Sequence, residues 1–160
     1  MSDEKVLTKE IAEQFLAAED FVDLNKFTKL EDDAAESLSK EDGDLELNGL
    51  LWLSDTAAEI LSKHEGYLEL SGLTELSDAA AESLSKRYGD LNLDGLIELS
   101  DAAAENLSKQ EEPLYLLGLS ELSDAAAESL SEMDNSNLYV TLDNLPASAA
   151  QILRDAGHGE

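Results

Sequence analysis

The sequence ELSDAAAESLS occupies Glu75–Ser85 and returns without a change at Glu121–Ser131. The two copies lie two periods of 23 residues apart, and related sequences fill the periods between and around them. Similarity at a fixed period of this length is the signature of a chain built from stacked structural repeats. The period therefore decides the fold, and the other features of the sequence are interpreted relative to it.

Four positions of each unit carry the same residue type, three of them leucine and one glycine. With 23 residues between neighbours, these positions are Leu45, Leu68, Leu91 and Leu114; Leu47, Leu70, Leu93 and Leu116; Gly49, Gly72, Gly95 and Gly118; and Leu53, Leu76, Leu99 and Leu122. The pattern continues upstream over Val22–Leu30 and downstream over Leu138–Leu145, with a shift of one residue near 132–137. We therefore predict six strand-bearing units.

Each unit changes its periodicity midway. The alternation in Leu-x-Leu predicts a short strand, whereas Ala80, Ala81 and Leu84 have the spacing of one helix face. Ser77 and Asp78 are typical of a helix N-terminus, because serine caps free amide groups and aspartate complements the helix dipole. A unit this small cannot bury its apolar face alone, so the sequence predicts a stacked α/β solenoid with one continuous core.

The Leu-x-Leu-x-Gly-Leu segments, such as Leu68–Leu73, each followed by a helix, resemble the leucine-rich-repeat family over residues 21–153. Among members of this family, the sequence most resembles bacterial proteins whose helices are rich in alanine. The resemblance implies a right-handed superhelix, with parallel strands on the concave face and short helices on the convex face. One departure is that many members carry Asn or Cys just after the strand. There this chain has Phe27, Leu50, Leu73, Leu96 and Leu119, so we expect apolar packing and glycine turns to replace the side-chain ladder.

The two ends depart from the repeat. Thr8–Glu19 is amphipathic, and we expect residues 1–20 to form an N-terminal capping helix outside the repeat. Residues 21–154 form the predicted solenoid, and residues 155–160 a flexible tail. Ile152 and Leu153 either close the last unit or leave it open to a partner chain, which makes the expected state a monomer or a weak homo-oligomer through this unit.

Acidity is the dominant feature of the composition. The 160 residues include 37 Asp and Glu against 10 Lys and Arg, a formal net charge of −27. Such a surface repels nucleic-acid phosphates and anionic lipids, and it favours a protein partner with a basic surface. Solubility alone is an equally simple explanation. Because no cysteine, secretory leader or long apolar run is visible, we expect a cytoplasmic protein.

The residues between the inward leucines of each strand form the candidate recognition surface. Alternation places them on the opposite face, in rows that cross the predicted sheet. Exposed aromatic residues beside apolar ones are typical interface anchors. The alternative is a generic polar strand face on which tyrosines fill a curved sheet. The candidate partner-binding residues are Tyr67, Glu69, Asn92, Asp94, Tyr115, Leu117 and Tyr139, with Trp52 in an exposed loop as a second contact site.

No arrangement of residues indicates catalysis. The two histidines, His64 and His158, have no motif companions, and phosphate-binding and nucleophile motifs are absent. We therefore expect a protein-binding module that is not an enzyme and has no cofactor. The alternatives are a self-associating structural repeat and an acidic surface that binds divalent cations weakly. Asp90–Gly95 resembles the start of a calcium loop, but Leu91 and Leu93 are needed in the core.

Overall fold

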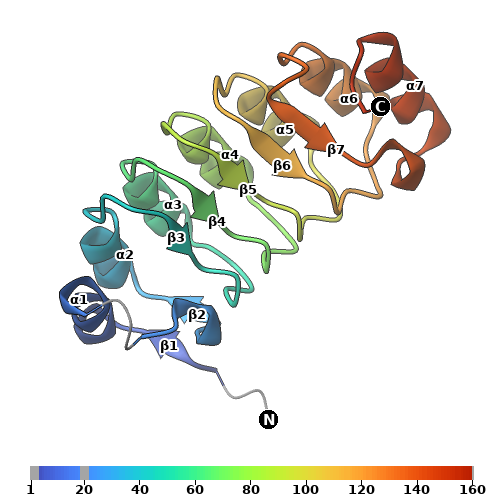
Figure 1. Cartoon of the computed structure of the whole chain (residues 1–160). Coiled ribbons are helices and arrows are strands. Elements are labelled where there is room, and N and C mark those ends of the chain that lie inside the picture. Colours follow the sequence, from blue (N-terminus) through green and yellow to red (C-terminus); the bar gives the residue numbers. More distant parts are fainter. Residues whose placement is uncertain (1–3, 19–21, 160) are drawn as a thin grey trace.

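Short parallel strands and short helices alternate along the computed structural model, which describes residues 4–18 and 22–159. The main sheet of the described chain has five parallel strands in sequential order, stacked from the middle of the molecule to its C-terminal end (Figure 1). Each strand is joined to the next through a helix on the other side of the stack. The strands are β3 (Leu45–Glu46), β4 (Leu68–Glu69), β5 (Leu91–Asn92), β6 (Leu114–Leu116) and β7 (Leu138–Val140).

The helices form a second layer, in which each helix contacts the next one along the chain. This two-layer stack confirms the α/β solenoid predicted from the 23-residue period. The helices are α1 (Lys9–Ala17), α2 (Asp32–Leu38), α3 (Asp55–Leu61), α4 (Asp78–Leu84), α5 (Asp101–Leu107), α6 (Asp124–Ser131) and α7 (Ala147–Asp155).

The core lies between the layers and consists of the repeating leucines and alanines. Strands β3 to β6 pair in register at the first leucine of each unit, so that Leu68 faces Leu45 and Leu91. These leucines are fully buried, as are Ala80 and Ala81 on the inner face of α4. Small alanines on the helices let the two layers approach closely, and the leucines fill the space between them.

The repeated glycine is required by close packing of the backbone. A Cβ atom at Gly72 would lie 2.1 Å from the Asn48 carbonyl oxygen of the preceding unit. Gly89 has a different reason, because its φ of +113° is a backbone conformation that residues with a side chain rarely adopt. Gly89 belongs to the turn before β5, and the C-cap of α4 is Ser85.

Serine and aspartate at the helix N-termini form a ladder that joins successive units. Ser77 Oγ accepts a hydrogen bond from Ala80 N at 3.0 Å, which confirms the predicted N-cap. The same hydroxyl donates to Asp55 at the start of the preceding helix, at 2.5 Å. Each capping serine thus also holds its unit against the one before. The pairs are Ser54–Asp32, Ser77–Asp55, Ser100–Asp78 and Ser123–Asp101, and Ser148 in the first turn of α7, which is not a cap, donates to Asp124 in the same way.

The N-terminal helix follows the repeat, contrary to our expectation. Leu7 and Thr8 stand three periods before Leu76 and Ser77, and Thr8 caps α1 as Ser77 caps α4. Two short strands, β1 (Val6–Leu7) and β2 (Lys29–Leu30), pair in parallel beside α1 and α2. This segment is therefore the second half of a unit, as well as a cover for α2.

The first predicted strand is replaced by a turn. Val22–Leu24 makes no strand in the described chain, and the 3-10 helix η2 (Leu24–Lys26) begins there. The Asp23 carboxylate accepts a hydrogen bond from Asn25 N at 3.1 Å, which stabilises the turn. The main sheet therefore has five described strands, where six strand-bearing units were predicted.

The C-terminal residues pack against the last unit. After the 3-10 helix η3 (Leu142–Asn144) and α7, His158 is only 2% exposed, and its Nε2 lies 3.2 Å from the Ser131 carbonyl oxygen. The segment predicted to be a flexible tail thus contains a buried side chain. No helix in the described part of the chain is both long enough and apolar enough to cross a membrane.

Candidate functional site

The strand face is the surface formed by the residues that alternate with the buried leucines of β4 to β7. In β6, Leu114 and Leu116 are buried and Tyr115 between them lies on the opposite face, half-buried. Parallel pairing places Tyr115 beside Asn92 of β5 on one side and Tyr139 of β7 on the other. The predicted alternation is therefore confirmed, and it brings candidate residues from separate units side by side.

Three tyrosines form a cluster on this face. The rings of Tyr115 and Tyr139 are stacked, with centroids 4.5 Å apart and an interplanar angle of 10°. Tyr67, just before β4, meets Tyr115 edge to face at 6.5 Å and 81°. Both geometries are favourable for aromatic rings, at about 0.5 to 1.5 kcal/mol per pair. These contacts therefore restrict the positions of the three rings.

The C-terminal end of the cluster is the part most open to solvent. Tyr139 and Leu117 are each 42% exposed, whereas Tyr67 and Tyr115 are half-buried. Glu69 is also half-buried, one unit before Asn92. An exposed aromatic ring next to an exposed leucine, backed by rings that cannot move freely, has the character of an interface anchor.

Carboxylates surround the tyrosine hydroxyls. Burial raises the pKa of Tyr67 above its usual 10.0, and the charges of Glu69, Asp94 and Asp90 raise it further. Burial followed by the charge of Asp90 also raises the pKa of Tyr115. Both hydroxyls therefore stay protonated at neutral pH. The Tyr115 hydroxyl faces Asp90 Oδ2 at 3.5 Å, so the face combines apolar rings with negative charge.

Asn92 was predicted to contact a partner, but it lies beneath the cluster and is only 8% exposed. Its Nδ2 donates to the Tyr67 hydroxyl at 3.0 Å, and its Oδ1 accepts from Asp94 N at 2.9 Å. Its role is to hold Tyr67 and the following turn. Strand alternation alone cannot reveal this burial, because the long side chain of Tyr67 crosses the neighbouring unit to cover it.

A partial side-chain ladder runs along the edge of the strand face, which we did not expect. Asn25 Oδ1 accepts from Asn48 N at 2.9 Å, and Asn48 Oδ1 accepts from Ser71 N at 3.0 Å. Asp94 Oδ1 accepts from Leu117 N at 2.8 Å in the same way. These residues occupy the position just before the repeated glycine. Apolar packing and glycine turns therefore share the joining of units with polar side chains.

On the acidic surface considered for cation binding, one oxygen of each of three side chains is already engaged within the chain. Asn92 Oδ1 and Asp94 Oδ1 each accept a backbone hydrogen bond, and Asp90 faces the Tyr115 hydroxyl. Across the described residues, no three His, Asp or Glu side chains are grouped closely enough to hold a metal ion.

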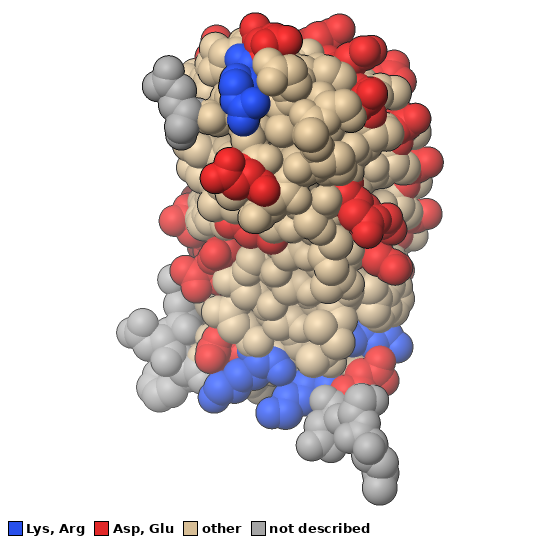
Figure 2. Space-filling model, turned by 90° about the vertical axis from the view of Figure 1, so that its right-hand side faces the viewer, with Lys and Arg blue, Asp and Glu red and all other residues tan. Residues whose placement is uncertain are grey.

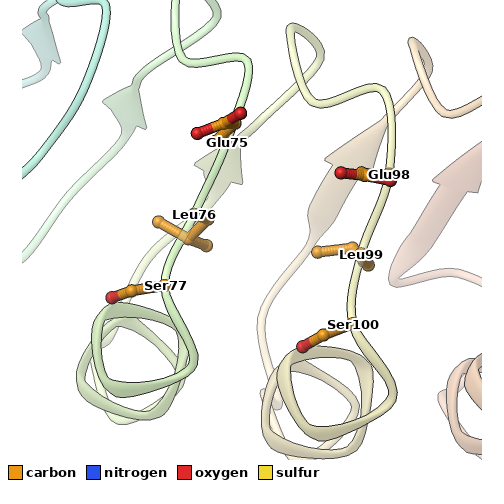
Figure 3. Close-up of a pocket in the computed structure, with 6 residues that line it drawn as sticks. All are labelled: Glu75, Leu76, Ser77, Glu98, Leu99 and Ser100. Carbon is orange, nitrogen blue, oxygen red and sulfur yellow. The ribbon is translucent and has the colours of Figure 1, made fainter.

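Trp52 is 50% exposed, as its loop position predicts, and the adjacent Leu51 is 59% exposed. Both lie between β3 and α3, in a segment separate from the tyrosine cluster. In the next two units, a pocket of about 550 Å³ separates Glu75–Ser77 from Glu98–Ser100 (Figure 3). The Glu75 and Glu98 carboxylates lie at its mouth, and the leucines and capping serines line it toward the helices.

Sequence reasoning missed a buried polar column in the helix-to-strand turns. His64, Arg87 and Gln110 stand 23 residues apart and are 0%, 3% and 5% exposed. Arg87 Nη2 lies 3.2 Å from His64 Nδ1 and donates to the Gly66 carbonyl oxygen at 2.6 Å. Burial lowers the pKa of Arg87 to about 10. The sequence signal that could have revealed this column is the 23-residue spacing of its three polar residues, although their types differ.

Comparisons with known proteins found no family model, no curated protein and no solved structure that matches this chain.

Proposed function

We propose that this chain is a non-enzymatic interaction module that binds a protein partner through the strand face. The observation that carries the proposal is the tyrosine cluster. The Tyr115 and Tyr139 rings are stacked, and Tyr139 is exposed, as is Leu117 on the same face. Such anchors supply much of the binding energy at protein interfaces, and they lose little conformational freedom when they are already packed.

The partner we propose carries a basic segment. Asp90, Asp94 and Glu69 adjoin the cluster, and the whole chain has a net charge of −27. Opposite charge accelerates encounter, and a guanidinium or ammonium group is also attracted to the face of a tyrosine ring. The resemblance to bacterial leucine-rich-repeat proteins supports the same use of the strand face. A cytoplasmic location is part of the proposal.

The test compares the proteins captured from native lysate by three versions of the chain. The double variant Leu117→Ser/Tyr139→Ala removes the exposed anchors and keeps the buried leucines. Tyr88→Ala is the matched control, because Tyr88 is 69% exposed but lies in the turn between α4 and β5. Losing two anchors costs about 2 kcal/mol or more, which is roughly a 30-fold loss of affinity.

We expect wild type and Tyr88→Ala to capture the same proteins, and the double variant to lose them. Synthetic peptides that cover the basic segments of those proteins should bind wild type with dissociation constants raised by moderate salt. Equal capture by the double variant, or binding only through acidic or neutral segments, would contradict the proposal. Melting curves of all three proteins check that each is folded.

A further inference from the structure

A second exposed surface lies on the loops that run from each strand to the next helix. We define the loop edge as the pairs of residues that precede the last leucine before each of the helices α1 to α5. These pairs are Lys5–Val6, Thr28–Lys29, Leu51–Trp52, Thr74–Glu75 and Ile97–Glu98. Leu51, Trp52 and Ile97 are 59%, 50% and 48% exposed, so the loop edge carries large apolar side chains in contact with solvent.

We propose that the loop edge is a two-fold interface between two copies of this chain, centred on Leu51 and Trp52. The chain is strongly acidic, yet this side of the molecule presents a broad area without charged side chains (Figure 2). Acidic side chains lie mainly toward its margins. A second acidic copy meets the least repulsion there, and exposed apolar area favours association.

The sign of the charge reverses across Trp52. Lys29 occupies the equivalent position one unit before Trp52, and Glu75 occupies it one unit after. Two units away from Trp52, Val6 occupies this position on the N-terminal side, with Lys5 just before it, and Glu98 occupies it on the C-terminal side. In Figure 2, Lys and Arg side chains gather at the N-terminal end of this surface. The loop edge is therefore basic, apolar and acidic in that order.

This order is self-complementary under a two-fold axis. In a symmetric dimer, if one residue contacts a second residue of the other copy, the second also contacts the first in return. An axis through Leu51–Trp52 exchanges the units on either side. Lys29 of each copy then lies opposite Glu75 of the other. Leu51 and Trp52 pack against the same residues of the second copy.

The pocket of about 550 Å³ leaves room for the Lys29 side chain of the second copy. The backbones of neighbouring units pair on either side of it along this edge, between β1 and β2 and again between Glu98 and Glu121. Between Glu75–Ser77 and Glu98–Ser100 the loops separate instead, with both carboxylates at the opening (Figure 3). In the proposed dimer the Glu75 carboxylate receives Lys29 of the other copy.

The expected dimer is weak and depends on salt. Five units span four strand spacings of ~4.8 Å, about 20 Å in all, which is short for a protein interface. We therefore expect a dissociation constant of roughly 10 to 100 µM. Moderate salt should strengthen it, because salt screens the long-range repulsion between two acidic copies more than it weakens contacting pairs.

The test is a charge exchange followed by analytical ultracentrifugation, from low micromolar to near-millimolar protein in moderate salt. Lys29→Glu and Glu75→Lys should each raise the dissociation constant about tenfold, because each places like charges together at two symmetric contacts. The double variant Lys29→Glu/Glu75→Lys should return to within about threefold of wild type, since it restores opposite charges. Trp52→Ser should be monomeric throughout.

Lys86→Glu, Glu82→Lys and their double variant are matched controls. They produce the same changes of net charge at an exposed pair whose charged atoms lie 3.5 Å apart on α4, away from the loop edge. These controls should dimerise like wild type. Emission from Trp52, the single tryptophan of the chain, should shift to shorter wavelength as wild type associates.

Two results would overturn the proposal. One is a wild-type chain that remains monomeric at near-millimolar concentration, which would show that the loop edge does not bind a second copy of this chain. The other is a dimer that the double charge exchange does not restore, which would place the contact elsewhere. Circular dichroism and melting curves identify any variant that fails to fold, and Glu75→Lys alone still tests the interface if Lys29→Glu disturbs β2.

Discussion

Side chains join neighbouring units of this solenoid both at the helix N-termini and in the helix-to-strand turns, but the residues used differ between the two regions. At the N-termini every unit from α3 to α6 uses the same residue, a serine that caps its own helix and bonds to the helix before. In the turns, one position carries a different residue in each unit, and four of the five are buried. The residues at this position are Glu41, His64, Arg87, Gln110 and Met133.

The comparison shows that variation at a repeated position does not by itself indicate a ligand site. Arg87 and His64 vary from their equivalents, yet both are buried and bonded to backbone groups. Tyr139 and Leu117 also vary, but both are exposed, and Tyr139 belongs to the packed tyrosine cluster. Variation together with exposure is therefore the better criterion, and it selects the strand face and the loop edge.

The largest effect on the free energy of unfolding is expected from Arg87→Ala. This variant tests whether a residue that differs from its equivalents in other units can stabilise the fold. Arg87 donates to the carbonyl oxygens of Gly66, Gly89 and Asp90, at 2.6, 3.1 and 3.0 Å. Leu68 N still donates to the Asp90 oxygen in the variant, but the Gly66 and Gly89 oxygens lose their partner and a cavity opens, at a cost of about 3 to 5 kcal/mol of unfolding free energy. Chemical denaturation of both proteins measures the loss.

Lys86→Ala is the control for this experiment, because Lys86 is the preceding residue and its side chain is 68% exposed. An exposed lysine in a single surface ion pair contributes about 0.5 kcal/mol or less. If Arg87→Ala costs no more than Lys86→Ala, the turns do not hold the units together, and the comparison fails.

An intermediate effect is expected from Ser100→Ala, which tests the regular ladder. Ser100 Oγ accepts from Ala103 N at 3.0 Å and donates to Asp78 in the preceding unit. Loss of an N-cap serine costs about 1 kcal/mol, and loss of the second bond adds to it, for about 1 to 2 kcal/mol in all. Ser120→Ala, at an exposed loop serine, should change the stability by less than about 0.5 kcal/mol.

The double variant Ser100→Ala/Asp78→Ala separates the two roles of this serine. If the ladder bond contributes, the double variant should be more stable than the sum of the two single effects predicts, because each single variant already breaks that bond. Strictly additive losses would show that Ser100 acts only as a cap.

The sequence predicted those parts of the molecule that follow from period and alternation. The leucine and alanine positions, the capping serines and the row of outward residues are all set by the 23-residue step and the alternation of a strand. The Leu7–Thr8 start of α1 carries the same 23-residue spacing as the later units. Because this first unit has no clear strand, however, the sequence predicts a helix outside the repeat.

The remaining features depend on how far side chains reach across units, which periodicity does not specify. Tyr67 covers Asn92 from the neighbouring strand, and Arg87 reaches back to the turn that contains His64. His158 returns from beyond α7 to contact the Ser131 carbonyl group. Each contact joins residues 20 or more positions apart, and only the stacked backbone brings them together.

The smallest effect is a pH dependence that arises at His64. Its Nε2 donates to the Gly43 carbonyl oxygen at 2.7 Å, so its Nδ1 is the acceptor that faces Arg87. Burial and the positive charge of Arg87 lower the pKa of His64 below 6.5, although the Gly43 hydrogen bond and the charges of Glu41 and Asp44 oppose this. A protonated ring would lose its acceptor and place two cations in contact.

The sign of the effect follows from the protons that each state binds. Above about pH 6.5 the ring is neutral in both states and its contribution to stability is complete. As the pH falls through this value toward the lower folded-state pKa, the unfolded chain binds a proton that the folded chain resists. The free energy of unfolding of wild type therefore decreases toward acid more steeply than that of His64→Gln, whose side chain does not titrate. Urea denaturation at a series of pH values from about 7.5 to about 5.5 measures both curves. Because the variant keeps every acidic residue of the chain, carboxylate titration contributes equally to both, and parallel curves would show that folding does not lower the pKa of His64.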